Sequence, residues 1–167
     1  MCYENNLKRM SSFYVNEVHL ITMLLPYIER RIGEDCKVHT IFQNNLDRTV
    51  NLLLEKLNLK NEMKAKIKSI DWKTKEAKKY IEENNINNKN THYIFINGDL
   101  NFIKEANYLV EETNKDVKIN IINCYNIVEF NKNIIDILNS TDKILNTSGE
   151  HEIEEIFPEY VKEKKKA

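Results

Sequence analysis

Short apolar strands alternate with amphipathic helices along this chain, and the alternation constrains the fold more than any other feature. Residues 36–42, 91–96 and 117–122 have the apolar content of buried strands. Between them, residues 46–57 and 100–113 repeat apolar side chains at helical spacing. Strands that alternate with helices favour a mostly parallel sheet with helices on both faces. We therefore predict an α/β fold with three layers.

The rest of the chain fits the same scheme. A long amphipathic helix is predicted over residues 15–32, and Gly33 is a natural end for it. Pro26 lies inside that pattern, so we expect a kink or two abutting helices there. Residues 65–72 read as a short strand because their isoleucines alternate loosely. The other predicted elements are a helix over 73–83, a polar loop over 84–90, a helix over 131–138, a short strand over 143–147 and a final helical segment that Pro158 ends.

Length and composition indicate one ordinary globular domain. The chain has 167 residues, of which 31% are charged and 41% hydrophobic, enough to bury a core without disulfides. A net charge of −1 gives no general field that would attract nucleic acid or an anionic membrane. Neither an internal repeat nor a linker is visible. We therefore expect a single domain over residues 1–161, followed by a charged, solvated tail over residues 162–167.

Cysteine usage and the N-terminus favour a cytoplasmic protein. Cys2, Cys36 and Cys124 are widely spaced and form neither a CxxC pair nor a disulfide framework, so we expect reduced thiols. The first residues lack the apolar core of a signal peptide, and no apolar run is long enough to cross a bilayer.

Polar and aromatic side chains follow the ends of four predicted strands. In an open parallel sheet, ligands bind outside the carboxyl ends of the strands. Asn and Asp also end strands simply because turns need them, and Asp99 is in addition a natural helix cap. The strand that begins at Val117 ends in a thiol, a phenol and an amide, which suggests that it emerges into a crevice. The predicted ligand-binding residues are Gln43, Asn44, Asp71, Trp72, Asn97, Asp99, Cys124 and Tyr125.

Several catalytic and cofactor chemistries lack their sequence patterns. With three glycines, the chain has neither GxxxxGK[ST] nor GxGxxG for holding phosphate. Its four histidines show no metal-ligand spacing. His39 and His92 both lie in predicted strands and could approach each other across the sheet, but a packed, hydrogen-bonded histidine is favoured over a metal ligand. Cys124 has no local base, so a buried, inert thiol is favoured over a nucleophile. We predict no catalytic residue, metal or cofactor.

Three stretches together resemble a known sensory domain. They are "FYVNEVHLITMLLPYIERRIGEDCKVHTIF" at 13–42, "IFINGDLNFIKEANYLVEE" at 94–112 and "NIINCYNIVEFNKNIIDILNSTDKIL" at 120–145. An aromatic pair, an acidic residue, a long helix with a central proline and a strand resemble the opening of the MEDS domain of methanogens and methylotrophs. A strand that closes on a Cys/Tyr pair, followed by an aromatic residue, a helix and a last strand, resembles its ending, and "IFPEY" resembles its final Pro/Tyr element.

The resemblance implies a RecA/KaiC-like fold without the Walker A loop. Such domains accompany signalling modules and are proposed to sense small, often hydrocarbon-derived compounds. The family often carries a His-x-Cys motif before the aromatic pair and a histidine in the last helix-to-strand turn. This chain has Arg9, Met10 and Ser11 at the first place and Thr141 at the second. Metal or thiol sensing through that motif is therefore not implied here, and only the adjacent Cys/Tyr pair carries over as ligand-lining.

The sequence leads us to expect a non-catalytic sensory domain. It would bind a small molecule at the strand ends and act through a protein partner in a signalling pathway, with no contact to nucleic acid or membrane; self-association stays open. The alternative is a protein-interaction module with a vestigial crevice. An atypical nucleotide-binding enzyme ranks last, because residues 13–17 offer neither a basic nor a glycine-lined path for phosphate.

Overall fold

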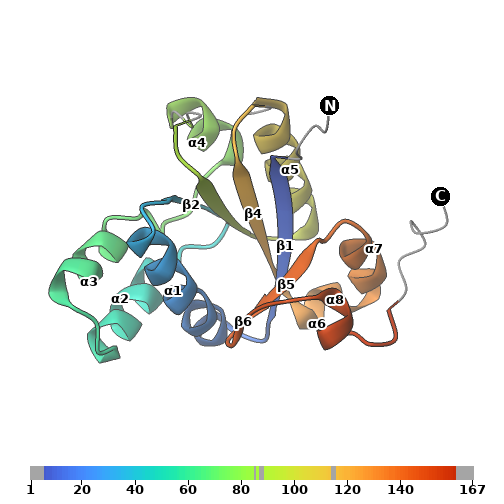
Figure 1. Ribbon diagram of the computed structural model, residues 1–167, viewed down its shortest axis with the longest axis horizontal. Coiled ribbons are helices and arrows are strands. Elements are labelled where there is room, and N and C mark those ends of the chain that lie inside the picture. Colours follow the sequence, from blue (N-terminus) through green and yellow to red (C-terminus); the bar gives the residue numbers. More distant parts are fainter. Residues whose placement is uncertain (1–5, 85, 87–88, 114–115, 161–167) are drawn as a thin grey trace.

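A six-stranded, mostly parallel sheet organises the protein, with the strand order β2-β3-β4-β1-β5-β6 (Figure 1). The first five strands of that order run parallel, and β6 pairs antiparallel with β5. The computed structural model describes residues 6–84, 86, 89–113 and 116–160. The strands are β1 (Leu7–Tyr14), β2 (Lys37–Phe42), β3 (His92–Asn97), β4 (Ile119–Asn126), β5 (Lys143–Asn146) and β6 (Gly149–His151).

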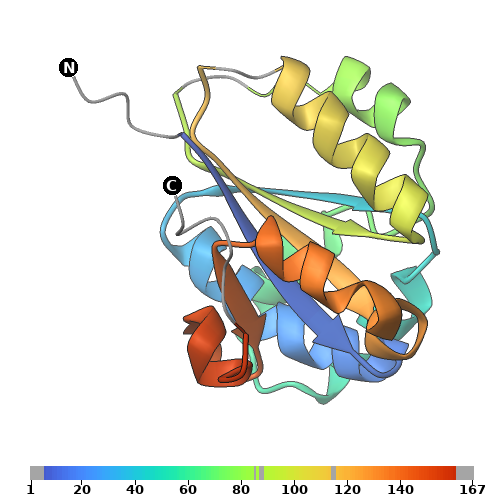
Figure 2. The ribbon, with the colours of Figure 1, turned by 90° about the vertical axis from the view of Figure 1, so that its right-hand side faces the viewer.

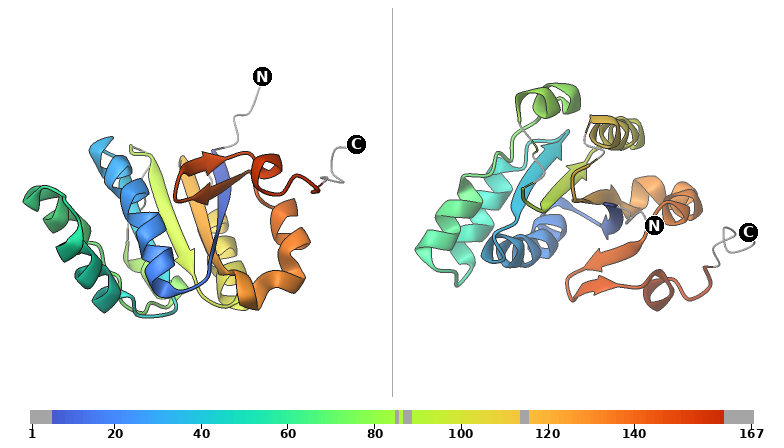
Figure 3. Two further views of the ribbon diagram at one scale, coloured as in Figure 1. Left: turned by 90° about the horizontal axis from the view of Figure 1, so that it is seen from below. Right: turned by 45° about the horizontal axis from the view of Figure 1, so that its top comes forward.

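Helices cover both faces of this sheet (Figure 3). Helices α1, α2 and α3 pack on the first face, and α4, α5 and the segment from α6 to α7 pack on the second. The predicted mostly parallel sheet flanked by helices is thus confirmed. The helices are α1 (Glu17–Gly33), α2 (Asp47–Lys56), α3 (Asn61–Lys68), α4 (Ala77–Glu83), α5 (Leu100–Thr113), α6 (Ile127–Phe130), the 3-10 helix η1 (Asn131–Asn133), α7 (Ile134–Asn139) and α8 (Ile153–Ile156).

The chain leaves the centre of the sheet in two opposite directions. After β1 it passes over the first face as α1 and reaches β2 at the edge. After β4 it passes over the second face as α6 and α7, crosses β1 and reaches β5 (Figure 2). Because β1 and β4 are neighbours, the segments that follow them diverge, and they open a crevice at this switch in strand order.

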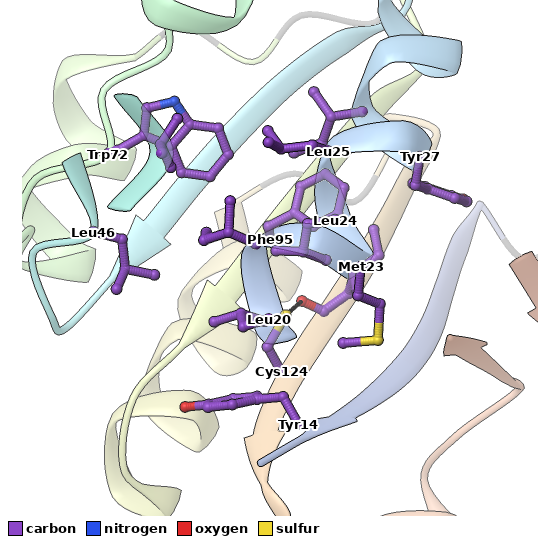
Figure 4. Packing of buried hydrophobic residues seen from close by; sticks show 14 of the residues in the cluster. Tyr14, Leu20, Met23, Leu24, Leu25, Tyr27, Leu46, Trp72, Phe95 and Cys124 are labelled. Atoms are coloured by element: carbon purple, nitrogen blue, oxygen red, sulfur yellow. Dashed lines mark hydrogen bonds between the residues drawn. The ribbon is translucent and has the colours of Figure 1, made fainter. Parts of the chain in front are cut away.

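The core on the first face is built mainly from α1 and the sheet. Leu20 and Leu24 of α1 are buried in one cluster with Phe95 of β3 (Figure 4). Ile28 of the same helix belongs to this cluster too and is fully buried. Each such side chain contributes about 1.5–3 kcal/mol by leaving water. Pro26 lies inside α1, which is a single helix rather than two abutting ones.

Strand β1 was absent from the sequence prediction, and its polar centre explains why. Ser11 and Ser12 are buried in the middle of the sheet, where a hydrophobic strand would carry apolar residues. Both hydroxyl groups have hydrogen-bond partners next to the strand. Ser11 Oγ lies 2.7 Å from Thr141 Oγ1, and Ser12 Oγ donates to the carbonyl of Leu145 at 3.0 Å. Edge strand β6, only three residues long, was also missed.

The strand predicted over 65–72 is wrong. Residues up to Lys68 belong to helix α3, and a turn follows. Met63 and Ile67 are four residues apart and face the same core, so the spacing is helical rather than alternating. The predicted helix over 73–83 is shorter, since α4 begins at Ala77. The charged tail over 162–167 lies outside the described residues.

Candidate ligand-binding site

A crevice lies at the carboxyl ends of the central strands, as the sequence predicted. Its volume is about 570 Å³, and it lies between the segments that follow β1 and β4. Gln43, Asn44 and Asp99 line it. Gln43 and Asp99 are paired: the Asp99 N–H donates to Gln43 Oε1 at 2.7 Å, and Gln43 Nε2 donates to Asp99 Oδ2 at 3.1 Å. The sequence did not predict four other lining residues, because it did not predict β1, which they end or follow. They are Tyr14, Val15, Asn16 and Glu17.

Asn97 and Cys124 lie beneath this crevice rather than in it. The Asn97 side chain is buried, and its Nδ2 donates to the Tyr14 hydroxyl at 2.8 Å and to the Cys124 carbonyl at 3.2 Å. The thiol of Cys124 faces the first-face core, among α1 side chains (Figure 4). Burial raises the pKa of this thiol, which keeps it protonated and unreactive.

Asp71 and Trp72 lie away from the crevice, because the segment that holds them is a turn after α3 and not a strand end. Trp72 is only 1% exposed; its indole Nε1 donates to the Ile67 carbonyl, and its ring packs on Phe42 with the centroids 5.7 Å apart. Asp71 lines a different hollow, of about 690 Å³, at the β2 edge of the sheet. Trp72 is therefore a core residue.

The charge of the crevice disfavours phosphate. Glu17, Asp99 and Glu129 contribute carboxylates, and the described lining residues include no lysine or arginine. Asn16 caps α1 by accepting from the His19 N–H at 2.8 Å, so a backbone donor that a phosphate would need is occupied. These facts agree with the absence of a phosphate loop in the sequence.

Tyr125 lies on the opposite face of the sheet from Cys124, in a groove between α5 and α7. We call this hollow the α5–α7 groove; its volume is about 320 Å³. Two neighbours fix the phenol ring: Phe13 stacks on it with centroids 5.7 Å apart, and Phe130 meets it edge-on at 5.3 Å. The residues that line the groove include Arg9, Leu100, Ile103, Lys104, Asn107, Glu111, Asn123, Tyr125, Asp136 and Ile137.

The Tyr125 hydroxyl makes no hydrogen bond with any residue that the structure describes, although the residue is only 5% exposed. Within the described chain, the buried side-chain polar atoms that are both sealed and unpaired are the Tyr27 hydroxyl and Arg31 Nε. The Tyr125 hydroxyl is not among them, so it has access to the α5–α7 groove that it lines. Burial raises the pKa of Tyr125 to about 12, which leaves the phenol a proton donor at neutral pH.

A polar wall stands beside this phenol. Asn107 and Asn123 form a reciprocal amide pair, with Nδ2 to Oδ1 distances of 2.8 and 3.1 Å. Arg9 donates through Nε to Asn107 Oδ1 at 3.1 Å and through Nη2 to Glu111 Oε2 at 2.7 Å. These contacts join β1, β4 and α5, so the wall is held from three elements.

Two distant parts of the chain meet next to the groove. Ser11 of β1 and Thr141, which are 130 positions apart, share the 2.7 Å hydroxyl contact. Beside them, the Arg9 backbone N–H donates to Asp142 Oδ2 at 2.9 Å. Over the described residues, no group of three or more His, Cys, Asp or Glu side chains is placed to hold a metal ion.

The expected approach of His39 and His92 is confirmed. His39 Nε2 lies 3.0 Å from His92 Nδ1, and the rings stack with centroids 5.2 Å apart. The other nitrogen of His39, Nδ1, lies 2.7 Å from the Tyr80 hydroxyl. Burial is the main cause that lowers the pKa of His39 to about 4; His92 and Lys37 add to it. The pair is hydrogen-bonded and packed, the reading that the sequence favoured.

A serine, a histidine and a carboxylate also come together at the β5–β6 turn. Ser148 Oγ lies 2.7 Å from His151 Nε2, and His151 Nδ1 lies 3.0 Å from Glu155 Oε2. This spacing is that of an activated nucleophile. However, Ser148 Oγ also donates to Asn146 Oδ1 at 2.8 Å, so its proton is shared with a second acceptor. None of the hollows described above includes these residues.

No protein-family model, curated protein or solved structure matches this chain. None of the helices in the described part of the chain has the length and apolar character needed to span a bilayer.

Proposed function

We propose that the protein is a non-catalytic, MEDS-like sensory domain, which binds a small molecule in the α5–α7 groove and acts through a protein partner. One observation carries this proposal: Tyr125 presents an unpaired hydroxyl group on a ring that is almost fully buried and held by two aromatic neighbours. This hydroxyl reaches the α5–α7 groove, so an acceptor on a ligand can pair with it there, and the fixed ring requires no reordering to receive it.

Two features support the MEDS-like, RecA/KaiC-like part of the proposal. The parallel order β5-β1-β4-β3-β2, with β1 inside the sheet between β5 and β4, fits the fold that the resemblance implies. The positions that correspond to the family's cysteine and last histidine, Ser11 and Thr141, lie in hydrogen-bond contact.

Compared with the α5–α7 groove, the strand-end crevice is the less suitable site for the ligand. Small-molecule pockets are mostly apolar with a few convergent polar groups. The crevice is lined by short polar side chains and carboxylates, and Gln43 and Asp99 already satisfy each other. The α5–α7 groove combines isoleucine and leucine side chains with the amide wall and the phenol.

Native mass spectrometry of freshly purified protein tests the proposal and distinguishes the two hollows. We expect an additional mass that disappears on denaturation, and we expect Tyr125→Phe to retain less of it. The matched control is Tyr14→Phe, which removes the same atom from a residue that lines the crevice. Loss of the adduct in the Tyr14 variant alone would place the ligand in the crevice instead. A ligand-free mass in the wild type would favour an interaction module.

That second candidate, a protein-interaction module, rests on exposed valines. Val15 is 57% exposed, Val18 55% and Val128 78%. They follow Tyr14 and Asn126, which are paired neighbours in β1 and β4. A contiguous exposed apolar patch on a monomeric protein often marks an interaction site. Analytical ultracentrifugation of wild type and Val128→Asp tests self-association through this area.

The non-catalytic part of the proposal depends on Ser148. We expect a fluorophosphonate probe to leave Ser148 unmodified, because its hydroxyl is shared with Asn146 and none of the hollows described above includes it. Stoichiometric labelling of Ser148 that His151→Asn abolishes would show an active serine and contradict the proposal.

The family alignment has its own test. The variant R9H/S11C/T141H restores the residue types that the resemblance assigns to these positions. Because Ser11 and Thr141 already touch, we expect this variant to bind zinc with a submillimolar dissociation constant, whereas S11C alone does not. Equal zinc binding by the two variants would remove this support for the resemblance.

A further inference from the structure

We infer that the α5–α7 groove takes an uncharged ligand that carries a hydrogen-bond-accepting oxygen on a short apolar body, such as a small amide or ketone. This inference rests on the proposed function, because it names the class of ligand for the same site. Three properties of the groove point to it: donors still available on the polar wall, a lining whose formal charges sum to zero, and a small apolar floor.

The polar wall keeps hydrogen-bond donors that no described residue takes up. The Tyr125 hydroxyl has no acceptor among the described residues, and Asn123 uses one of its two amide hydrogens on Asn107. Arg9 uses Nε and one Nη2 hydrogen, which leaves further N–H groups on the guanidinium. Asn107 has nothing left, since its Oδ1 accepts twice and its Nδ2 donates both to Asn123 and to the Ile103 carbonyl at 2.7 Å. An acceptor oxygen on a ligand would pair with these donors.

The charges that line the groove cancel. Arg9 is already paired with Glu111 at 2.7 Å, and Lys104 is matched by Asp136 among the lining residues. An anionic ligand that approached the Arg9 guanidinium of the polar wall would be repelled by the adjacent Glu111 carboxylate. A cationic ligand would face the hydrogen-bond donors of the polar wall. The formal charges of the lining therefore sum to zero, and a charged ligand would lose water without a net counter-charge to compensate, which is costly in a partly buried site.

The floor of the groove sets the size and polarity of the rest of the ligand. Ile103 and Ile137 are almost fully buried, and with Leu100 they supply the apolar side of the groove. A volume of about 320 Å³ is near the lower end for small-molecule sites. A short branched or linear hydrocarbon body with one carbonyl group fits both the chemistry and the space.

The test uses three probes that share one carbon skeleton: isobutyramide, isobutyrate and isobutylamine. Each is titrated into 15N-labelled full-length protein, and the side-chain amide resonances of Asn107 and Asn123 report on the groove. We expect isobutyramide to bind at least about tenfold more tightly than the acid or the amine. Tyr125→Phe should weaken isobutyramide about three- to tenfold, the effect of one hydrogen bond, while Tyr14→Phe should leave it unchanged.

The outcomes separate this inference from the proposed function. If isobutyrate or isobutylamine perturbs the groove as strongly as isobutyramide, the ligand class is wrong while the groove remains a binding site. The class is also wrong if the native adduct depends on Tyr125 and isobutyramide does not bind. If there is neither a native adduct nor a groove shift with any probe, the proposed function fails first. A spectrum with native dispersion for Tyr125→Phe shows that its loss of binding does not come from misfolding.

Discussion

Protonation of His39 should be the main reason why this protein becomes less stable in mild acid. The ring lies between Tyr80 and His92, with Lys37 nearby, and neither ring nitrogen contacts a carboxylate that would stabilise the imidazolium. Its pKa falls from an ordinary 6.5 to about 4 in the folded protein. Between these two values the unfolded chain binds more protons than the folded one, so the free energy of unfolding decreases as the pH falls.

The size of the effect follows from the two pKa values. The full difference corresponds to about 3 kcal/mol, with the stability present above about pH 6.5 and lost as the pH falls to about 4. Urea unfolding at about pH 7 and about pH 4.5 should therefore show that the wild type loses about 2.5 kcal/mol more than His39→Gln does. Comparing the change with pH, rather than the stability itself, removes the cost of the substitution and the titration of carboxylates common to both proteins.

His19→Gln is the matched control, because His19 lies in α1, outside the His39–His92–Tyr80 cluster. If His39→Gln also follows the wild-type curve between about pH 6.5 and about pH 4.5, the imidazole is not held neutral by its surroundings and the reasoning is refuted.

Three further predictions follow from buried contacts. Asn107→Ala should lower the free energy of unfolding by about 1–3 kcal/mol, measured with urea, because it leaves the amide of Asn123 without its partner. Iodoacetamide should modify half-buried Cys36 in the native protein but leave the fully buried Cys124 unmodified, by peptide mass spectrometry; rapid loss of both thiols would contradict the placement of β4. Gly98→Ala should cost about 1–3 kcal/mol, since the new Cβ would lie 2.6 Å from the nearest side-chain atom, and an unchanged urea midpoint would show that the loop yields freely.

Elements with strong periodicity could be predicted from the sequence, and those that depend on distant partners could not. Helix α5 was predicted over its observed bounds because apolar side chains recur on one face. Strand β1 was invisible because its central serines are tolerated only next to Thr141 and the carbonyl of Leu145. Residues 65–72 were misread because two isoleucines three positions apart fit a helix as well as a loosely alternating strand.

The candidate site was predicted in part for the same reason. From the predicted strand ends, we correctly expected Gln43, Asn44 and Asp99 to lie together. Adjacent strand residues point to opposite faces, so Cys124 and Tyr125 had to separate, but the sequence alone does not tell which face each one meets. The groove itself is made by Arg9 of β1 and by α5, α7 and β4, and no local pattern predicts that meeting.

The central place of β1 has a consequence for biosynthesis. Its hydrogen-bonded neighbours are β4 and β5, which begin at Ile119 and Lys143, more than 110 residues further along the chain. A nascent chain must therefore emerge from the ribosome for most of its length before its first strand has a partner. Contacts between residues so far apart in sequence slow folding, and until they form the edges of the existing strands remain unpaired. Fragments that end before β4 should not fold, and newly made protein should depend on chaperones more than a helical bundle of the same length.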